Sequence, residues 1–220
     1  MSPIKAVIFD MDGTLIDTER VCRTAWSRAS AELGAPLPDW MLHAFVGCSL
    51  PNARSMLMEE FGDEALIDAM FKRMLELFHE GCAHDLEPRD GAGEALEGLK
   101  DAGYTLALAT SSYREGAVEK MKRFGFYPYF ATSAFGDEIE RSKPEPDIYL
   151  KTAEHLGIDP RECVAVEDSF NGVRAAHAAG MQVFMVPDFN EPTEEIANMC
   201  AGVLKSLHEL PDAVEALRMS

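Results

Sequence analysis

Two aspartates follow the first apolar segment of the chain closely enough to act on one ligand. Asp10 and Asp12 come directly after the apolar residues 6–9, and Gly13 and Thr14 complete a turn-forming sequence. An apolar run that ends at such a turn is typical of a buried strand. Ligands bind open parallel sheets at the carboxyl ends of the strands, so both carboxylates are expected at a binding edge.

Carboxylates at this spacing are costly to bring together unless a cation lies between them. The pair formed by Asp10 and Asp12 therefore predicts a bound metal ion, and it offers a carboxylate as a nucleophile. The sequence Asp10-x-Asp12-Gly13-Thr14-Leu15 resembles the first signature of the haloacid-dehalogenase-like hydrolases. The resemblance implies a Mg²⁺-dependent phosphohydrolase, because most members of that superfamily have this activity.

The resemblance assigns a role to each polar residue of this signature. Asp10 would be the nucleophile, since a carboxylate can attack phosphorus in line and form an acyl phosphate that water removes. Asp12 would be the general acid and base, which protonates the leaving oxygen and later accepts a proton from water. Thr14 and the amides around Gly13 would hold phosphate oxygens.

Two later stretches supply groups that can bind an anion. Thr110 and Ser111 lie where an apolar strand is expected to end and a helix to begin, and a helix N-terminus favours anions. An ordinary helix cap would place the same residue types there. Lys143, in the sequence Lys-Pro-Glu-Pro, resembles the family lysine that pairs with the nucleophile and the phosphate. The alternative is an exposed loop lysine.

Two adjacent acids, Glu167 and Asp168, follow another apolar run and resemble the acidic pair with which the family binds its metal. Mg²⁺ prefers six hard oxygen ligands and keeps several waters. The Asp10 carboxylate, the Asp12 main-chain carbonyl and the Asp168 carboxylate would supply three ligands. Glu167 would contribute directly or from the outer shell. The structural alternative is that Asp168 only caps the next helix.

Strands alternate with helices along most of the chain, which predicts a parallel sheet with helices on both faces. We therefore expect an α/β fold with a Rossmann-like, doubly wound sheet. The expected strands are residues 4–9, 104–109, 129–134, 163–166 and 182–186. The helices expected among them are residues 92–102, 114–124, 147–156, 170–179, 193–198 and 207–218.

A stretch without a convincing strand separates the first strand from the others. It contains expected helices at residues 18–33, 39–46, 51–61 and 64–80. This pattern predicts an α/β core domain at residues 1–15 and 88–220 and a helical domain at residues 16–87. The two chain crossings between them would form a hinge for a lid.

The helical insert resembles the cap of the subgroup that contains β-phosphoglucomutase and several sugar-phosphate phosphatases. Asp12 argues against the dehalogenases of the superfamily, which lack this aspartate. The mutase carries a histidine and an arginine where this chain has Cys22 and Leu50. Loss of a guanidinium removes a strong contact to a second phosphate. We therefore expect a phosphatase for a small phosphomonoester, such as a sugar phosphate, and keep the phosphohexomutase as the alternative.

Substrate choice in this subgroup would depend on polar residues of the cap. The candidates are Glu19, Arg23, Cys48, Ser49 and Arg54. Glu19 and Arg23 are four residues apart on an expected helix, so they could instead form a simple ion pair along it.

The net charge of -18 on 220 residues argues against nucleic acid or an anionic membrane as a partner. A small phosphorylated metabolite must then be attracted by a local cationic site. Five widely spaced cysteines predict free thiols in a cytoplasmic protein. No apolar run approaches the roughly 20 residues of a membrane span. We expect a monomer by default, and a non-catalytic binding module stays open because fold alone does not fix function.

Overall fold

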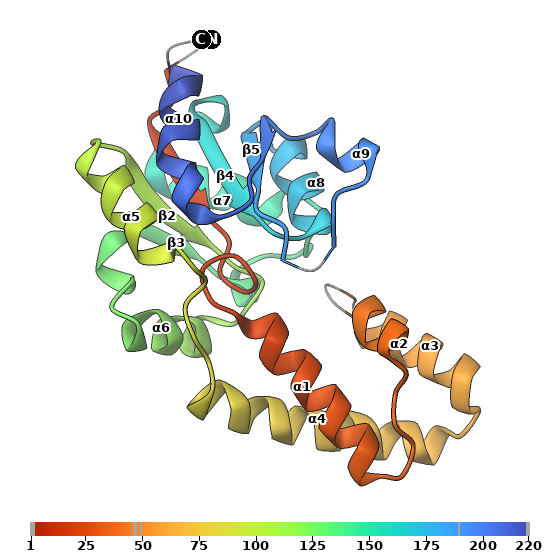
Figure 1. Ribbon diagram of the computed structural model, residues 1–220. Helices are drawn as coiled ribbons and strands as arrows, with labels where there is room; N and C mark the ends of the chain where they lie inside the picture. The colour runs from red at the N-terminus through yellow and green to blue at the C-terminus, as the bar shows by residue number, and fades with distance from the viewer. Residues whose placement is uncertain (1–2, 46–47, 49, 189, 219–220) are drawn as a thin grey trace. The chain divides into compact units, whose positions relative to one another are not determined.

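The computed structural model contains a six-stranded parallel sheet in the order β3-β2-β1-β4-β5-β6 (Figure 1). It describes residues 3–45, 48, 50–188 and 190–218. The strands are β1 (Ala6–Phe9), β2 (Thr105–Ala109), β3 (Thr132–Ala134), β4 (Cys163–Glu167), β5 (Gln182–Met185) and β6 (Gly202–Val203). The predicted α/β class with a doubly wound parallel sheet is confirmed.

The register of the sheet places the ends of its three central strands side by side. Phe9 of β1 pairs with Leu108 of β2 on one side and with Val166 of β4 on the other. Because the strands are parallel, the polar residues that follow these positions share one edge of the sheet: Asp10, Thr110 and Glu167.

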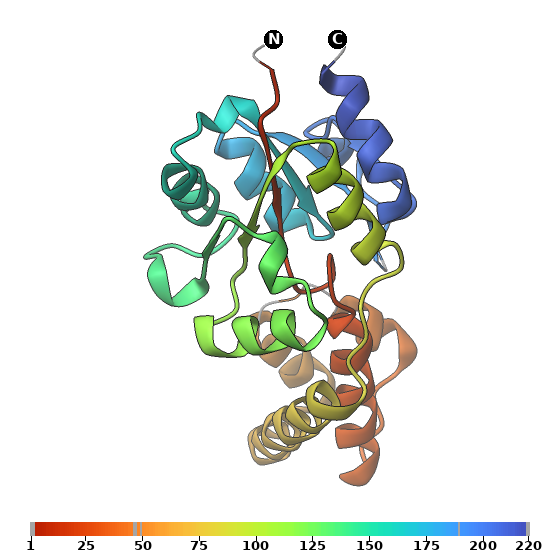
Figure 2. The ribbon, with the colours of Figure 1, turned by 90° about the vertical axis from the view of Figure 1, so that its left-hand side faces the viewer.

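Helices cover both faces of the sheet. In Figure 2, β1 lies between α5 (Ala92–Asp101) and α10 (Leu210–Arg218) on one side and α7 (Asp147–Leu156) on the other. Successive side chains of a strand point to opposite faces. Ala6 and Ile8 accordingly share a core cluster with residues of α7 and α8 (Phe170–Ala178). All of β1 is buried, which explains its uninterrupted apolar sequence.

The connections of the sheet hold the loop after β2 in a fixed place. The N–H of Gly136 donates to the carbonyl of Ser112 at 3.0 Å. A Cβ at Gly136 would lie 2.0 Å from the carbonyl oxygen of Ser111, so only glycine permits this approach. The other connecting elements are α6 (Arg114–Arg123), α9 (Glu194–Ala197) and 3₁₀ helices at Tyr127–Tyr129, Gly136–Glu138, Pro160–Glu162 and Leu207–Glu209.

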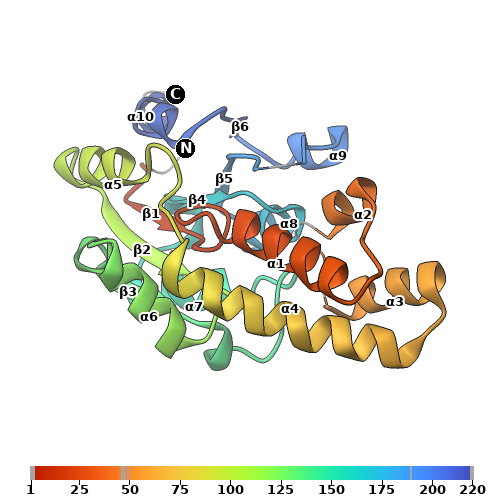
Figure 3. The same ribbon diagram turned by 60° about the horizontal axis from the view of Figure 1, so that its bottom comes forward.

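Four helices follow the first strand and pack around their own apolar core. They are α1 (Thr18–Glu32), α2 (Asp39–Ala44), α3 (Leu50–Phe61) and α4 (Glu64–His84), and α1 lies alongside α4 in Figures 1 and 3. The side chains of Asp17 and Asp63 accept hydrogen bonds from main-chain N–H groups and cap α1 and α4. Gly81 allows close packing, since a Cβ there would lie 2.6 Å from a methyl group of Val21.

The contacts divide the chain into two compact units. The sheet unit comprises Met1–Ile16 and Pro88–Ser220, and the helical unit comprises Asp17–Glu87. Among the described residues, no helix is both long enough and apolar enough to cross a membrane. That the helical unit acts as a cap stays a prediction.

The structure corrects the predicted elements at three places. The strand expected at residues 129–134 begins only at Thr132, because Pro128 lies in the 3₁₀ helix Tyr127–Tyr129. The expected last helix opens with the 3₁₀ turn Leu207–Glu209 before α10 begins. The sixth strand, β6, was not predicted, since two residues are too few to form a period-two pattern.

Trp26 is expected to stabilise the helical unit far more than Trp40 does. Trp26 is 2% exposed, and its ring lies 4.9 Å from that of Phe45 and 5.0 Å from that of Phe71. Trp26→Ala should lower the free energy of unfolding by about 3–5 kcal/mol. Trp40 is 56% exposed, so Trp40→Ala should change it by no more than about 0.5 kcal/mol. Urea denaturation followed by circular dichroism measures both, and equal effects would contradict this packing.

Candidate active site

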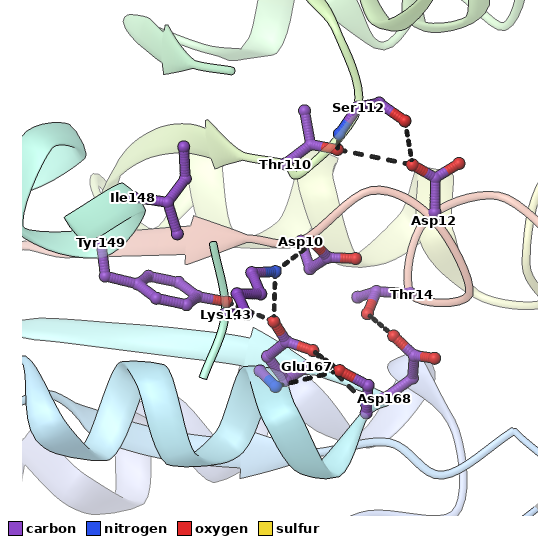
Figure 4. A network of polar contacts seen from close by, with 12 residues as sticks. Asp10, Asp12, Thr14, Thr110, Ser112, Lys143, Ile148, Tyr149, Glu167 and Asp168 are labelled. Atoms are coloured by element: carbon purple, nitrogen blue, oxygen red, sulfur yellow. Dashed lines mark hydrogen bonds and ion pairs between the residues drawn. The ribbon is translucent and has the colours of Figure 1, made fainter. Parts of the chain in front are cut away.

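Asp10 lies immediately after β1 and is fixed at the sheet edge by its main chain (Figure 4). Its N–H donates to the carbonyl of Val166 at 3.0 Å. Asp10 is only 6% exposed. A carboxylate removed from water to this extent requires a charged partner. Figure 4 shows that partner, the ammonium of Lys143, between Asp10 and Glu167.

The Lys143 ammonium joins two neighbouring strand ends. Its Nζ donates to Oδ1 of Asp10 and to Oε1 of Glu167, both at 2.5 Å. Burial disfavours the charge of Lys143, but the two carboxylates outweigh this effect and raise its pKa above the ordinary value. Lys143 therefore stays positively charged next to the candidate nucleophile.

Glu167 is held by donors on both of its oxygens. Besides Lys143, the hydroxyl of Tyr149 donates to Oε1 at 2.6 Å. The N–H and the hydroxyl of Ser169 donate to Oε2 at 3.3 and 3.1 Å. Glu167 is fully buried, and a Cβ at Gly172 would lie 1.9 Å from its Oε1. Glu167 is thus a fixed anchor for Lys143, and glycine at position 172 leaves the room it occupies.

Three carboxylates form a cluster that suits a hard cation. Oxygens of Asp10, Glu167 and Asp168 lie within 4.8 Å of one another. The hydroxyl of Thr14 donates to Oδ1 of Asp168 at 2.8 Å. Gly13 has a φ of +83°, and a Cβ there would lie 2.2 Å from Oδ2 of Asp168. This donor set is the type that Mg²⁺ binds, so the residues fit the predicted metal.

The electrostatics of the cluster also favour an added cation. Burial, together with the carboxylates of Glu167 and Asp12, raises the pKa of Asp10 above its ordinary value, and Lys143 opposes this rise. An attacking carboxylate must be ionised. A divalent cation at the cluster would oppose this rise in pKa and favour the ionised form of Asp10.

Asp12 is directed toward the loop after β2 (Figure 4). The hydroxyl of Ser112 donates to its Oδ2 at 2.6 Å, and the hydroxyl of Thr110 lies 3.4 Å from the same oxygen. The Lys120 ammonium lies 3.3 Å from its Oδ1. Thr110 is fully buried and its hydroxyl accepts the N–H of Ser112 at 3.0 Å, whereas Ser111 is exposed. The structure thus brings Thr110 to Asp12.

The family described as haloacid dehalogenase-like hydrolase matches residues 7–186, which is more than half of the chain and includes every motif of the site. The chain belongs to this family. The predictions that it is an enzyme and a hydrolase of this superfamily are confirmed. Enzymes of this family generally use a metal ion, in agreement with the acidic cluster at Asp10, Glu167 and Asp168.

Several relatives of this hydrolase span nearly the same length. A phosphorylated carbohydrates phosphatase from Thermotoga maritima is 35% identical over 179 residues, which are 81% of this chain and 83% of the relative. A solved Thermotoga maritima structure, described as a candidate beta-phosphoglucomutase, has a TM-score of 0.81 at 30% identity and covers 97% of this chain and 100% of its own. An aspartate-to-asparagine variant of Rhodobacter sphaeroides CbbY, solved with xylulose 1,5-bisphosphate, has a TM-score of 0.73 at 30% identity and covers 94% and 96%.

The candidate substrate residues of the hydrolase lie in the helical unit. Glu19 and Arg23 are partly buried on α1. Arg54 of α3 forms ion pairs with Asp68 at 2.7 Å and with Glu64 at 3.5 Å. These pairs give Arg54 a structural role within its own unit. Cys48 is partly buried, and Ser49 lies outside the described residues.

Sequence reasoning missed four residues that contact the candidate catalytic groups: Tyr149, Ser169, Ser112 and Lys120. Ser112 and Ser169 each follow a predicted site residue by one position, so their nearness to the strand ends was a usable signal. Tyr149 and Lys120 lie inside helices. Their contacts depend on which face of α7 or α6 turns toward the site, and no local motif indicates this.

Removal of the Lys143 charge is expected to destabilise the sheet unit. Lys143→Met would leave the buried carboxylates of Asp10 and Glu167 without their cation, at a cost of about 3–5 kcal/mol in the free energy of unfolding. Lys205 is exposed, so Lys205→Met is the matched control and should cost no more than about 0.5 kcal/mol. Denaturant unfolding at pH 8 with a chelator measures both. Indistinguishable values for the two variants would contradict the role given to Lys143.

Proposed function

We propose that this hydrolase is a Mg²⁺-dependent phosphatase that cleaves a phosphorylated carbohydrate through an aspartyl phosphate on Asp10. The observation that carries the proposal is the Lys143 ammonium, 2.5 Å from both Asp10 and Glu167 and beside the acidic cluster. A carboxylate nucleophile and a fixed cation are then side by side. The Thermotoga maritima phosphatase that is 35% identical supports the substrate class.

In the proposed first step, an oxygen of Asp10 attacks phosphorus, and the bond from phosphorus to the leaving oxygen breaks. Lys143 lies against Asp10 and offsets the negative charge of the phosphoryl group. The leaving oxygen takes its proton from Asp12. In the second step, water attacks the phosphorus of the acyl phosphate while Asp12 accepts its proton, and the carboxylate of Asp10 is regenerated.

The carboxylates of Asp10 and Asp168, with the main-chain carbonyl of Asp12, would hold Mg²⁺. Glu167 would contribute from the outer shell, because both of its oxygens already accept hydrogen bonds from Lys143, Tyr149 or Ser169. When bound, Mg²⁺ supplies positive charge that favours approach of a phosphate to these carboxylates. Gly13, Thr14, Thr110 and Ser111 would help to orient phosphate oxygens.

We also infer that the helical unit, Asp17–Glu87, acts as the cap that selects the substrate. Its polar residues Glu19 and Arg23 remain our candidates for contact with the carbohydrate, with Ser49 and Arg54 as further positions. Lids of this kind commonly exclude water while they are closed and admit it when they open.

A mutase is the second candidate function, because the candidate beta-phosphoglucomutase of Thermotoga maritima is 30% identical over nearly the whole chain. Asp12 would serve a mutase as well as a phosphatase. The two differ in the fate of the phosphoryl group, which a mutase returns to a sugar and a phosphatase gives to water. The products therefore distinguish them.

Purified protein with Mg²⁺ is expected to release inorganic phosphate from one group of sugar phosphates. The screen should include xylulose 1,5-bisphosphate, and also β-glucose 1-phosphate with a trace of the 1,6-bisphosphate. Asp10→Asn, which keeps the shape but not the nucleophile, should release none. Conversion of glucose 1-phosphate to glucose 6-phosphate without free phosphate would establish the mutase instead. Turnover by Asp10→Asn at the wild-type rate would contradict both the phosphatase and the mutase, because each uses Asp10 as its nucleophile.

Mg²⁺ is expected to raise the melting temperature of the wild-type protein and not that of Asp168→Asn. Mg²⁺ at 100 times its dissociation constant should stabilise the folded state by about 2.7 kcal/mol. Asp101→Asn is the control, since Asp101 is exposed and lies at the end of α5. Differential scanning calorimetry with and without chelator measures the shift. If Mg²⁺ raised the melting temperature of Asp168→Asn as much as that of the wild type, Asp168 would not be a ligand of the ion.

A further inference from the structure

A second lysine, Lys120, lies at the candidate active site beside Asp12. The Nζ of Lys120 is 3.3 Å from Oδ1 of Asp12, and the side chain of Lys120 is 20% exposed. We propose that Lys120 is a positioning residue that fixes the carboxylate of Asp12 for proton transfer to the leaving oxygen. This inference rests on the proposed function, in which Asp12 is the general acid.

The phase of α6 turns Lys120 toward Asp12. The helix buries Ala117 and Met121, and Lys120 lies next to Met121 on its partly buried side. Lys122, two residues further on, is exposed, and its ammonium lies over the ring of Tyr127 at 5.6 Å. The two lysines therefore share a helix and a charge but differ in whether they reach the site.

Lys120 and the loop after β2 hold different oxygens of Asp12. Ser112 and Thr110 donate to Oδ2, at 2.6 and 3.4 Å. Within the described residues, the side-chain hydrogen bond found for Oδ1 of Asp12 comes from Lys120. Donors on both oxygens define the plane of the carboxylate, whereas a donor on one oxygen leaves it free to rotate.

The orientation of an acid matters most when the leaving group is a strong base. A general acid must reach the leaving oxygen within hydrogen-bonding distance, and a small displacement can cost a large factor in rate. An aryl oxide such as 4-nitrophenolate leaves readily without a proton, whereas unsubstituted phenolate is more basic and gains more from protonation. Loss of a positioning residue should therefore slow hydrolysis of phenyl phosphate more than hydrolysis of 4-nitrophenyl phosphate.

The test compares kcat/KM for phenyl phosphate and 4-nitrophenyl phosphate, because kcat/KM covers the steps up to departure of the leaving group. Lys120→Met should lower kcat/KM about tenfold for phenyl phosphate and no more than about twofold for 4-nitrophenyl phosphate. Lys120→Arg should restore most of the loss, since it keeps the donor and the charge. Lys122→Met is the matched control and should leave both values unchanged.

Asp12→Asn separates failure of this inference from failure of the proposed function. It should lower kcat/KM by about 100-fold or more for phenyl phosphate, and by much less for 4-nitrophenyl phosphate. If Asp12→Asn is selective in this way but Lys120→Met slows both esters equally or neither, Lys120 does not position the acid. If Asp12→Asn itself slows both esters equally, Asp12 is not the acid, and both statements are wrong.

Discussion

The ion pairs of Lys143 with Asp10 and Glu167 are the interaction on which the rest of the site depends. Both carboxylates are buried, and each lies 2.5 Å from the same ammonium. Desolvated charges are stable only when they are paired and hydrogen-bonded. The surrounding residues satisfy this requirement, because Tyr149 and Ser169 bind the oxygens of Glu167 that face them. The lysine is consequently fixed in position before any substrate arrives.

The parallel sheet makes this arrangement possible. Asp10 and Glu167 belong to adjacent strand ends, and the N–H of Asp10 bonds to the carbonyl of Val166. Acidic groups brought together in this way repel one another, which contributes to the raised pKa of Asp10. The same repulsion favours the binding of a divalent cation. Together with Lys143, that cation would offset the negative charge of a phosphoryl group. The sheet topology is therefore the origin both of the repulsion between the carboxylates and of their capacity to bind a cation.

The residues at strand ends could be predicted from the sequence, because an apolar run that stops at a polar residue indicates both the strand and its edge. Asp10, Thr110 and Glu167 were found in this way. Tyr149 and Lys120 were not, since the face that a helix turns inward depends on packing far away in sequence. Arg54 illustrates the same limit: its partner Asp68 lies on the next helix, and a motif comparison gives no indication of it.

The short elements were missed, or predicted with wrong bounds, for a different reason. A strand of two residues, such as β6, carries no periodic pattern. The proline that shifts the start of β3 was visible, but its effect required knowledge that Tyr127–Tyr129 would close a 3₁₀ turn. None of these errors affected the candidate site, because it is built from the ends of β1, β2 and β4.

In the proposed mechanism, Asp10 carries the phosphoryl group between the two steps. The most direct measurement is a rapid acid quench during turnover of 4-nitrophenyl phosphate with Mg²⁺, followed by mass spectrometry of the intact protein and of its peptides. We expect a transient species that bears one phosphoryl group on Asp10. A phosphoryl group on another residue, or full turnover with Asp10 unmodified at every sampled time, would contradict it.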